Sequence, residues 1–355
     1  MKIFLKTYGC QANIADSEVI AGLLKKHKFT LVKSESQADL ILINSCSVKN
    51  STQSKILDYI KKHKTKKLAI GGCLPRTLDL RKKFPNLISI FDTNSIQKLP
   101  KILKQGKDAF SNEKESRLFL PLIRKNKDIA IIPIAEGCLN SCTYCATKLS
   151  RGRLRSYRIG DIKREFDKAL KKSCKIVYLT SQDNGCYGFD LKTNLPELLD
   201  ALTKIKGDYA LRVGMMNPFY IRKFLSDLIQ SYKSKNIMKF LHIPLQSGSD
   251  KILKDMKRTY SVEDFKAIVR TFRKNFPKIT IATDVIVGYP TETEKDFILT
   301  YNLIQNLKPR VLNISKFSSR PRTEASKLPQ LSSEIIKKRT LKINKLYQEI
   351  RNGLI

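Results

Sequence analysis

Short apolar runs alternate with charged, helix-like segments along the first hundred residues. The apolar runs predict buried strands at 2–7 (KIFLKT), 39–44 (DLILIN), 67–72 (KLAIGG) and 87–92 (LISIFD). The segments around them predict helices at 16–28, 47–63, 75–84 and 95–105. Because strands that alternate with helices are typical of parallel sheets, this region predicts a Rossmann-like α/β domain.

The alternation restarts after a polar stretch, 106–128, which has little periodicity and is predicted to be a linker. Strands are predicted at 129–135, 175–181, 209–214, 239–245, 279–287 and 310–317. Helices are predicted around 159–173, 194–205, 217–231, 249–257, 261–275 and 293–307. Six βα units are fewer than the eight of a closed TIM barrel, so the pattern favours an open, six-unit partial TIM barrel.

A basic, amphipathic helix is predicted at 331–352, packed on the barrel. The expected organisation is therefore an N-terminal domain at 1–105, a linker at 106–128, a partial barrel at 129–330 and a C-terminal helical segment at 331–355. The fold class is α/β in both domains.

The chain carries far more positive than negative charge. It has 68 Lys and Arg residues against 32 Asp and Glu residues, which gives a formal net charge of +36. An excess of this size favours a polyanionic partner, and nucleic acid is the main candidate. A membrane surface is the lesser alternative, because no apolar run reaches membrane-spanning length and no lipidation motif is present.

The N-terminal sequence, MKIFLKTYGC, has only a short apolar patch. That patch is too short for a secretory signal, so a cytoplasmic, reducing location is expected. Disulfides are rare in such a compartment, and clustered cysteines there favour metal binding or catalysis.

Three of the eight cysteines, here named the loop cysteines, lie close together at Cys138, Cys142 and Cys145. Their C-x3-C-x2-C spacing follows the first predicted barrel strand, at the end where barrel enzymes place their catalytic loops. Such thiolates suit an iron–sulfur cluster or zinc, but structural zinc usually needs four protein ligands. Three thiolates on a four-iron cluster leave one iron open for a substrate or cofactor. Three buried structural cysteines are the alternative, which the Gly/Asn/Ser-containing loop does not favour.

Cys10, Cys46 and Cys73, here named the N-terminal cysteines, each follow the end of a predicted parallel strand. Because the carboxyl ends of parallel strands share one edge of a sheet, these thiols are expected to converge. Gly9, just before Cys10, would allow a close approach of the backbone. The sequence therefore predicts a second three-thiolate cluster, with three separately buried cysteines as the alternative.

These features together resemble the MiaB-like methylthiotransferases, a radical S-adenosylmethionine family. The loop cysteines and Tyr144 match the family's C-x3-C-x-aromatic-C signature, and the resemblance extends from about residue 2 to about residue 350. Further stretches that carry it are TYGCQANIADSE (7–18), GGCLPR (71–76), HIPLQSGSDKILKDMKR (242–258) and DVIVGYPTETEKDF (284–297).

Four stretches resemble the archaeal and eukaryotic type of the family, namely NSCSVKN (44–50), CLNSCTYCATKLSRG (138–152), LTSQDNGCYGFD (179–190) and LRVGMMNP (211–218). That type acts on N6-threonylcarbamoyladenosine beside the tRNA anticodon. The resemblance therefore implies an enzyme that inserts a methylthio group at C2 of this nucleoside. The alternatives are an isopentenyladenosine-type relative and, from a different class, a non-catalytic iron–sulfur protein that binds tRNA.

The resemblance also implies two [4Fe–4S] clusters and S-adenosylmethionine as cofactors. The cluster on the loop cysteines would bind S-adenosylmethionine at its open iron and, with one electron, yield a 5′-deoxyadenosyl radical. An auxiliary cluster on the N-terminal cysteines would hold the sulfur that is delivered. The implied partners are the tRNA anticodon stem-loop, an electron donor and a sulfur source, and no membrane is involved.

The residues implied to contact S-adenosylmethionine are Tyr144, Gln182, Asp183, Arg212, His242, Gln246 and Gly288. Gln182 and Asp183 follow the second barrel strand, where polar groups can meet the methionine part of the cofactor. Arg212 is a candidate partner of a carboxylate, or a structural ion pair. His242 fits a structural role equally well, and the GYP sequence that begins at Gly288 is also a turn signal.

A basic run follows the loop cysteines directly. Arg151, Arg153, Arg155 and Arg158 are expected to face the mouth of the site and to contact tRNA phosphates, which position a nucleic acid without reading it. A solvated basic loop is the alternative. Family members usually carry a C-terminal TRAM domain that helps to grip tRNA. Because this sequence ends at Ile355, that domain is expected to be absent here, either naturally or because the chain is truncated.

Overall fold

The computed structural model describes residues 1–48, 50–113 and 115–354. Lys49, Lys114 and Ile355, which belong to the predicted NSCSVKN stretch, linker and C-terminal segment, lie outside the described residues. The chain divides into two compact units. The first unit comprises residues 1–138 and 146–182, and the second comprises residues 139–145 and those from 183 onwards.

The first unit begins with a parallel sheet in the order β2-β1-β3-β4-β5. Its strands are β1 (Lys2–Thr7), β2 (Thr30–Leu31), β3 (Leu40–Ser45), β4 (Leu68–Gly72) and β5 (Ser89–Ile90). The register aligns Thr7 with Asn44 and Ser45 with Gly72, so the carboxyl ends of β1, β3 and β4 lie side by side. The predicted Rossmann-like parallel sheet is confirmed.

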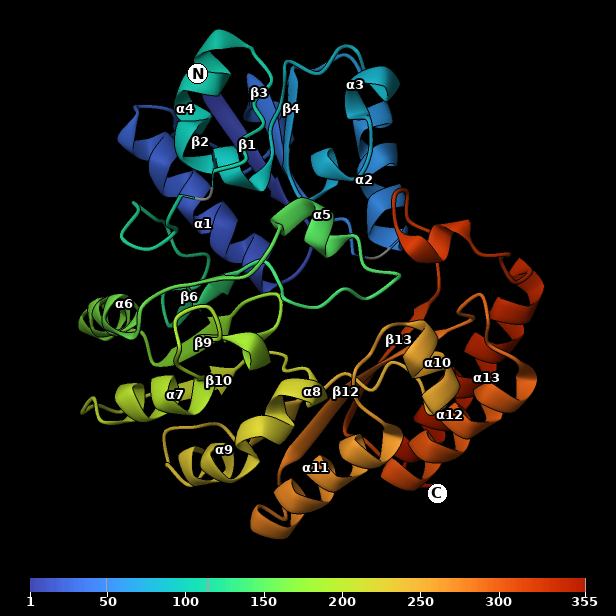
Figure 1. Ribbon diagram of the computed structural model, residues 1–355. Coiled ribbons are helices and arrows are strands. Elements are labelled where there is room, and N and C mark those ends of the chain that lie inside the picture. Colours follow the sequence, from blue (N-terminus) through green and yellow to red (C-terminus); the bar gives the residue numbers. More distant parts are fainter. Residues whose placement is uncertain (49, 114, 355) are drawn as a thin grey trace. The chain divides into compact units, whose positions relative to one another are not determined.

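Helices cover both faces of this sheet (Figure 1). They are α1 (Gln11–Lys26), α2 (Asn50–Lys62), α3 (Leu80–Lys83) and α4 (Leu99–Gln105). Strand β3 shows how the two faces arise, because successive side chains of a strand point to opposite sides. Leu40 and Leu42 join the core beneath α1 and α4, whereas Ile41 and Ile43 join the core beneath α2 and α3.

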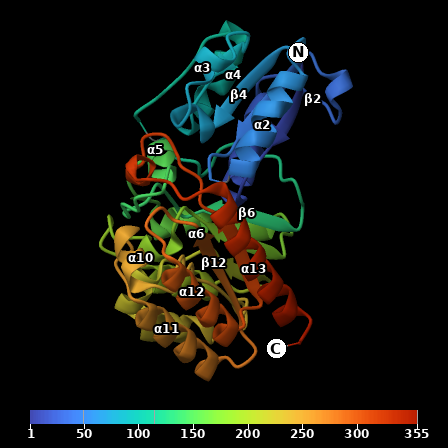
Figure 2. The same cartoon turned by 90° about the vertical axis from the view of Figure 1, so that its right-hand side faces the viewer.

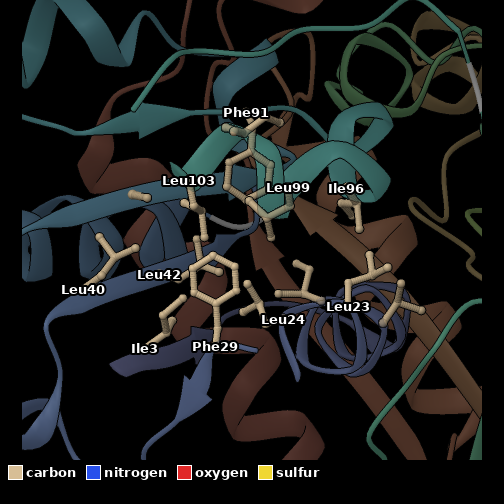
Figure 3. Close-up of a cluster of buried hydrophobic side chains, with 14 residues drawn as sticks. Ile3, Leu23, Leu24, Phe29, Leu40, Leu42, Phe91, Ile96, Leu99 and Leu103 are labelled. Atoms are coloured by element: carbon tan, nitrogen blue, oxygen red, sulfur yellow. The ribbon is translucent and has the colours of Figure 1, made fainter. Parts of the chain in front are cut away.

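The core on the α1 side is drawn in Figure 3, where Phe29 and Phe91 lie among the leucines of β3, α1 and α4. Leu24 and Leu99 are completely buried there. Full burial of one such side chain contributes about 1.5–3 kcal/mol. The result is a rigid platform that holds the ends of β1, β3 and β4 in place.

Two predicted elements of this sheet are shorter in the structure. The strand predicted at 87–92 is reduced to β5, and the helix predicted at 75–84 is split into a 3-10 turn, η2 (Leu74–Arg76), and α3. Asp79 starts α3 afresh because its carboxylate accepts a hydrogen bond from Lys82 N (3.0 Å). Pro85 follows α3 closely, and a proline disfavours helical backbone in the residue before it.

The rest of the first unit contains β6 (Ile129–Pro133), β7 (Ala135–Glu136), α5 (Thr147–Arg151), β8 (Arg155–Ser156), α6 (Ile159–Lys171) and β9 (Ile176–Thr180). β6 pairs in parallel with β9, and β7 pairs antiparallel with β8. α5 and β8 were not predicted, because elements of two to five residues are too short for a periodic pattern.

The predicted linker, 106–128, packs onto helix α1 in the first unit. Ile123 N donates to Glu18 O, and Lys125 N donates to a Glu18 carboxylate oxygen, both at 2.9 Å. Burial raises the pKa of Glu18, while the hydrogen bond from Lys125 lowers it. The predicted domain ranges stay a prediction, but the part of this stretch around Ile123 and Lys125 is bonded to α1 within the first unit.

The second unit contains a parallel sheet in the order β11-β12-β13. The strands of this sheet are β11 (Phe240–His242), β12 (Thr280–Val287) and β13 (Val311–Lys316). The strand β10 (Ala210–Val213) precedes them in the unit. Its helices are α7 (Leu195–Thr203), α8 (Pro218–Ile221), α9 (Leu225–Tyr232), α10 (Asp250–Asp255), α11 (Val262–Asn275), α12 (Glu294–Leu307) and α13 (Ser333–Arg351). Strands and helices alternate along this unit, as predicted.

Side-chain caps set the starts of α11 and α12 in the second unit. α11 and α12 begin at complete capping boxes, Ser261 with Asp264 and Thr293 with Asp296. Helix α13, predicted at 331–352, packs on β13 and α12 through a face that includes Ile343 (Figure 2). None of the helices in the described part of the chain is both long and apolar enough to span a bilayer.

Candidate functional site

The structure brings the N-terminal cysteines together at the carboxyl edge of the first sheet. The strand β1 ends shortly before Cys10, and β3 and β4 end directly before Cys46 and Cys73. These three strands are neighbours in the sheet. The Asn13 Oδ1 atom lies 3.5 Å from Cys10 Sγ and 4.0 Å from Cys73 Sγ, so these two sulfurs flank one amide oxygen. The expected convergence of the strand ends is therefore seen in the structure.

Gly9 makes room for this group of sulfurs. Its φ is +115°, and a Cβ atom added there would lie 2.7 Å from Cys46 Cβ and 3.0 Å from Cys46 Sγ. Only glycine fits a backbone of this conformation so close to a cysteine. Soft thiolates gathered around such a space are the donor set that iron–sulfur clusters use. The residues present fit a cluster.

Arg151 lies in a different place from the one predicted. Its side chain is 4% exposed. Nε donates to Cys73 Sγ (3.4 Å), and Nη2 donates to Asp16 Oδ2 (2.6 Å) and Asn13 Oδ1 (3.5 Å). The prediction that Arg151 faces outward to tRNA phosphates is wrong, because a buried carboxylate on α1 binds its guanidinium inside the unit.

Burial and charge act in opposite directions on this pair of groups. Burial opposes the charge of Arg151, but Asp16 and Cys73 hold the pKa of its guanidinium well above the ordinary value. Burial raises the pKa of the Cys73 thiol to about 11, although the neighbouring Arg151 lowers it. The guanidinium therefore favours the thiolate form in a site that burial would otherwise keep protonated.

Asp16 also belongs to a longer buried network. Arg117 Nε lies 3.4 Å from Asp16 Oδ1 and 3.2 Å from Glu136 Oε1. Tyr157 Oη donates to Glu136 Oε1 (3.0 Å) and accepts from Arg117 N (3.1 Å). These side chains are all buried, so each charge is neutralised by its neighbours rather than by water. Glu136 lies on β7, two residues before Cys138.

The other three predicted arginines reach the surface to different degrees. Arg153 and Arg158 are exposed, and Arg155 is half-buried. Arg153 and Arg155 line a cavity of about 400 Å³ together with Arg76 and Asn94. Their contact with tRNA phosphates stays a prediction, now restricted to these three.

Cys138 and Gln182 lie in the first unit. Cys138 N donates to Gly152 O (3.2 Å), and Gly137 N donates to Gln182 Oε1 (2.5 Å). Gln182 therefore holds the backbone immediately before the first loop cysteine. Its predicted contact with S-adenosylmethionine stays a prediction.

Cys142 and Cys145 lie in the second unit, in a tight turn where Cys145 N donates to Cys142 O (3.1 Å). Arg258 Nη1 donates to Cys142 Sγ (3.3 Å), and Arg258 Nε donates to Tyr260 Oη (3.3 Å). Arg258 Nη2 is buried without a hydrogen-bond partner in the described part of the chain. An orphaned buried guanidinium nitrogen beside a predicted ligand thiol marks a place for an acceptor.

Arg258 was missed by the sequence reasoning. It ends the stretch 242–258, whose resemblance to the family is one signal that points to it. Burial opposes the charge of Arg258, but Tyr260, Tyr144 and Cys142 hold the pKa of its guanidinium well above the ordinary value. The side chain therefore stays a cation at the turn of Cys142 and Cys145.

Tyr144 anchors the same turn in apolar surroundings. It packs against a buried cluster that includes Met256 and Tyr289. Thr143 Oγ1 and Tyr289 Oη are hydrogen-bonded at 2.8 Å, which ties the turn to the strand end after β12. The predicted contact of Tyr144 with the cofactor stays a prediction.

Asp183 is a buried carboxylate that organises the loop before Cys142. It accepts hydrogen bonds from Gly185 N (2.9 Å), Asn217 N (3.0 Å) and Asn140 Nδ2 (2.8 Å). Burial raises the pKa of Asp183, and these hydrogen bonds oppose that rise. Its position supports a structural role for the loop, and a direct contact with the cofactor stays a prediction.

His242 belongs to a polar row across the sheet of the second unit. His242 Nε2 lies 2.9 Å from Asp284 Oδ2, and Asn313 Nδ2 donates to Asp284 Oδ1 (2.6 Å). The three residues come from β11, β12 and β13. Asp284 and Asn313 were not predicted, and the signal for Asp284 is its place at the start of the stretch 284–297.

The remaining predicted cofactor residues have structural explanations. The Arg212 guanidinium stacks over Phe240, with Cζ 4.3 Å from the ring centre. Gln246 has a φ of +69° and bridges to β12 through its backbone. Gly288 has a φ of +82°, and a Cβ there would lie 2.5 Å from Ile336 Cγ1 on α13. Packing alone accounts for this glycine, and cofactor contacts at the three positions stay predictions.

An aromatic and basic surface patch, which was not predicted, lies on α8 and the loop before α7. Lys223 Nζ lies 5.3 Å from the ring centre of Phe189 and 5.0 Å from that of Phe219. Phe189 is 36% exposed. The ring of Tyr220 contacts the rings of both Phe189 and Phe219. Its hydroxyl donates a hydrogen bond to Asn140 Oδ1 (3.3 Å). The patch is therefore attached to the loop that precedes Cys142.

Comparisons with known proteins now define the class. Residues 132–304 match the model of the Radical SAM superfamily, and residues 2–91 match a model described as Uncharacterized protein family UPF0004. The chain therefore contains a radical SAM domain, which works with a [4Fe–4S] cluster and S-adenosylmethionine. The second match covers β1, β3 and β4 with the N-terminal cysteines.

Curated relatives define the family. The chain is 38% identical over 359 residues to the "Probable threonylcarbamoyladenosine tRNA methylthiotransferase" of Pyrococcus horikoshii, which covers 99% of this chain and 84% of that protein. It is 38% identical over 361 residues to the "Threonylcarbamoyladenosine tRNA methylthiotransferase" of Homo sapiens. That alignment covers 98% of this chain and 62% of the human protein. This chain belongs to the threonylcarbamoyladenosine tRNA methylthiotransferase family.

Solved structures support the fold. The radical S-adenosylmethionine methyltransferase TsrM from Kitasatospora setae matches with a TM-score of 0.65 and 12% identity, covering 92% of this chain and 75% of that one. The cobalamin-dependent S-adenosylmethionine radical enzyme OxsB matches with a TM-score of 0.60 and 13% identity, covering 99% of this chain and 56% of that one. The predicted α/β fold class, a parallel-sheet domain followed by a partial barrel, is confirmed.

Proposed function

We propose that this protein is a tRNA methylthiotransferase that inserts a methylthio group at C2 of N6-threonylcarbamoyladenosine next to the anticodon. The names of its relatives and the near-complete match to them support this substrate. The observation in the structure that carries the proposal is the convergence of the N-terminal cysteines, with Cys10 and Cys73 beside Asn13 and Cys46 beside Gly9. A radical SAM protein that only cleaves S-adenosylmethionine has no need of a second group of thiols.

The proposed enzyme uses two [4Fe–4S] clusters. The loop cysteines hold the radical cluster, and the N-terminal cysteines hold the auxiliary cluster that keeps the sulfur to be delivered. When bound, the radical cluster would supply the electron that cleaves one S-adenosylmethionine to methionine and a 5′-deoxyadenosyl radical for reaction at C2 of the adenine. A second S-adenosylmethionine would supply the methyl group of the methylthio product. An external electron donor and a sulfur source complete the reaction, and a cytoplasmic location accords with a tRNA substrate.

Arg258 serves this chemistry as an anion-binding group. Its buried Nη2 has no hydrogen-bond partner within the described residues, and its cationic state is stabilised by neighbouring groups. A carboxylate is the acceptor that a guanidinium binds best. The carboxylate of S-adenosylmethionine fits this donor, which places Arg258 in the role that the sequence reasoning gave to Arg212.

The aromatic and basic patch serves tRNA binding. Single-stranded RNA is commonly held by stacking of bases on aromatic rings, with cations nearby for the phosphates. Phe189 and Phe219 with Lys223 provide both elements. We expect Phe189→Ala with Phe219→Ala to weaken binding of an anticodon stem-loop by about 1–3 kcal/mol for each stacked base.

A matched control for the patch exists elsewhere on the chain. Phe119 is 46% exposed, and Arg164 Cζ lies 4.9 Å from its ring centre, so it offers the same chemistry in the first unit. Phe119→Ala should leave stem-loop binding unchanged. Equal losses for Phe119→Ala and for the double variant would mean that the loss of binding is not specific to the patch.

The decisive experiment measures the reaction itself. Anaerobically reconstituted protein is incubated with S-adenosylmethionine, a reductant, and tRNA that carries either N6-threonylcarbamoyladenosine or N6-isopentenyladenosine. Mass spectrometry of the digested nucleosides should show the 2-methylthio product only for the threonylcarbamoyl tRNA, together with 5′-deoxyadenosine. A product only on the isopentenyl tRNA would establish the alternative substrate, and no 5′-deoxyadenosine at all would favour a non-catalytic tRNA-binding protein.

A further inference from the structure

Arg151 places a desolvated positive charge directly on one of the N-terminal cysteines. Its Nε lies 3.4 Å from Cys73 Sγ, and both side chains are buried. Burial removes the water that would screen the charge, so its field at the sulfur is stronger than at the surface. Hydrogen bonds to cluster sulfurs and nearby charges are the means by which proteins set the reduction potential of an iron–sulfur cluster.

Asp16 places an opposite charge one step further away. Its Oδ2 lies 2.6 Å from Arg151 Nη2, and its Oδ1 lies 3.4 Å from Arg117 Nε. The carboxylate therefore weakens the field of Arg151 at Cys73 and also holds the guanidinium in one orientation. The two residues form a balanced pair in which each member acts on the sulfur with opposite sign.

Stability alone does not explain such a pair. A buried ion pair gains little over well-packed apolar residues, because the loss of hydration offsets most of the attraction. Arg151 lies on α5, six positions after Cys145, whereas Cys73 directly follows β4 and Asp16 lies on α1. The segment that follows the loop cysteines thus supplies the cation of the N-terminal thiol group, where it has a clear electrostatic use.

We propose that Arg151 and Asp16 are positioning residues that set the reduction potential of the cluster on the N-terminal cysteines. The inference rests on the proposed function, because it requires that these cysteines hold a cluster. On reduction the cluster gains one electron from an external reductant and becomes more negative by one charge. Arg151 stabilises that reduced form, and Asp16 opposes it.

The test isolates the N-terminal cluster in the full-length chain. The loop cysteines are all replaced by Ala, and the protein is reconstituted anaerobically with iron and sulfide. The cluster is then titrated with dithionite and redox mediators, and the reduced form is followed by electron paramagnetic resonance. Arg151→Gln should move the midpoint potential to more negative values, and Asp16→Asn should move it to more positive values.

Several variants separate electrostatics from folding. Arg151→Lys keeps the charge and should shift the potential less than Arg151→Gln. The double variant Asp16→Asn with Arg151→Gln removes both charges. Its midpoint potential should lie between those of the two single variants. Arg153→Gln removes an exposed arginine two positions away and should leave the potential unchanged. Iron content and circular dichroism are measured for every variant.

The outcomes are distinguishable. Shifts of opposite sign for Arg151→Gln and Asp16→Asn support the inference, and equal potentials or shifts of the same sign with full iron content overturn it. If Arg151→Gln fails to hold iron, Asp16→Asn decides, because an unchanged potential there also overturns the inference. If the parent protein with all loop cysteines replaced holds no cluster, the proposed function fails at the N-terminal cysteines, which is a separate result.

Discussion

Two regions of the molecule each place a buried arginine on the sulfur of a predicted cluster ligand. Arg151 donates to Cys73 Sγ (3.4 Å) in the first unit, and Arg258 donates to Cys142 Sγ (3.3 Å) in the second. The regions differ in what else the guanidinium contacts. Arg151 is ion-paired with Asp16, whereas Arg258 bonds to Tyr260 and keeps one buried nitrogen without a hydrogen-bond partner in the described part of the chain.

The difference corresponds to two uses of the same side chain. The charge of the Arg151 guanidinium is balanced by the Asp16 carboxylate, so it would bind a further anionic ligand weakly. Its remaining effect is on the sulfur of Cys73. A guanidinium with an orphaned donor carries a desolvation cost that an incoming anion would relieve. This difference supports the two proposals made above, a resident cluster in the first region and an anion site in the second.

The largest expected effect comes from removing the loop cysteines. Cys138, Cys142 and Cys145 are all changed to Ala, which removes the whole ligand set of the radical cluster. We expect 5′-deoxyadenosine formation to disappear and iron content to fall from about eight to about four atoms per chain. Iron analysis and chromatography of the reaction mixture measure both. Persistent cleavage of S-adenosylmethionine in this variant would show that the loop is not the radical site.

Removal of one N-terminal cysteine should stop methylthio transfer while S-adenosylmethionine cleavage continues. Cys73→Ala should abolish methylthio transfer because the auxiliary cluster loses a ligand, while some 5′-deoxyadenosine should still form. Analysis of the modified tRNA nucleoside and of 5′-deoxyadenosine in the same reaction measures methylthio transfer and S-adenosylmethionine cleavage. Cys174→Ala is the control, since Cys174 lies elsewhere in the first unit beside Arg124 and should transfer normally. Normal transfer by Cys73→Ala would disprove the assignment of the auxiliary site.

Replacement of Arg258 tests whether its orphaned nitrogen receives an anion. Arg258→Gln should raise the dissociation constant of S-adenosylmethionine by about 10–100-fold, because a hydrogen bond to a charged group contributes about 1.5–3 kcal/mol. Equilibrium binding to the reconstituted enzyme measures it. Arg212→Gln is the matched variant, because Arg212 stacks on Phe240 and should matter less. A larger loss for Arg212→Gln than for Arg258→Gln would restore the prediction made from the sequence.

The exposed arginines after the loop cysteines should behave differently from buried Arg151. Binding to unmethylthiolated tRNA should weaken linearly in log–log form as salt rises, with a slope of roughly −0.7 to −0.9 per phosphate contact. Arg153→Ala with Arg158→Ala should flatten that slope by about one unit per lost contact. A salt titration of the double variant beside the unmodified protein measures it. An unchanged slope would place the tRNA path on other basic residues.

The smallest expected effect concerns thiol reactivity in metal-free protein. Burial raises the pKa of Cys73 to about 11, so at pH 8 only about 0.1% of that thiol is thiolate. Its alkylation by iodoacetamide should therefore rise about tenfold for each pH unit up to about 11. Exposed Cys10 is the internal control and should react readily at pH 8. Mass spectrometry of the labelled peptides separates the two sites, and equal rates at pH 8 would contradict the burial of Cys73.

Much of the fold follows from the hydrophobic pattern. The strands at β1, β3, β4 and β12 and the helices α11, α12 and α13 lie close to their predicted ranges, because each combines a clear period with a strong start or stop signal. Short elements such as α5 and β8 were missed, since they depend on contacts within the unit rather than on a repeating pattern.

The sequence by itself determined where the cysteines lie relative to the strands, and with the parallel topology that was enough to predict that the N-terminal ones converge. It also determined the large positive charge and the spacing of the loop cysteines. These properties are local or cumulative, so they can be read without knowing which distant segments meet.

Only the tertiary structure decided what the arginines do. Arg151 and Arg153 are two positions apart in one basic run, yet one is buried against Asp16 and the other is exposed. Likewise, Arg258 contacts Cys142 across 116 positions of sequence. A long charged side chain can turn inward only where a distant carboxylate, thiol or hydroxyl compensates its loss of hydration. That partner is chosen by the packing of α1, β4 and the turn around Cys142, and no local pattern in the sequence records it.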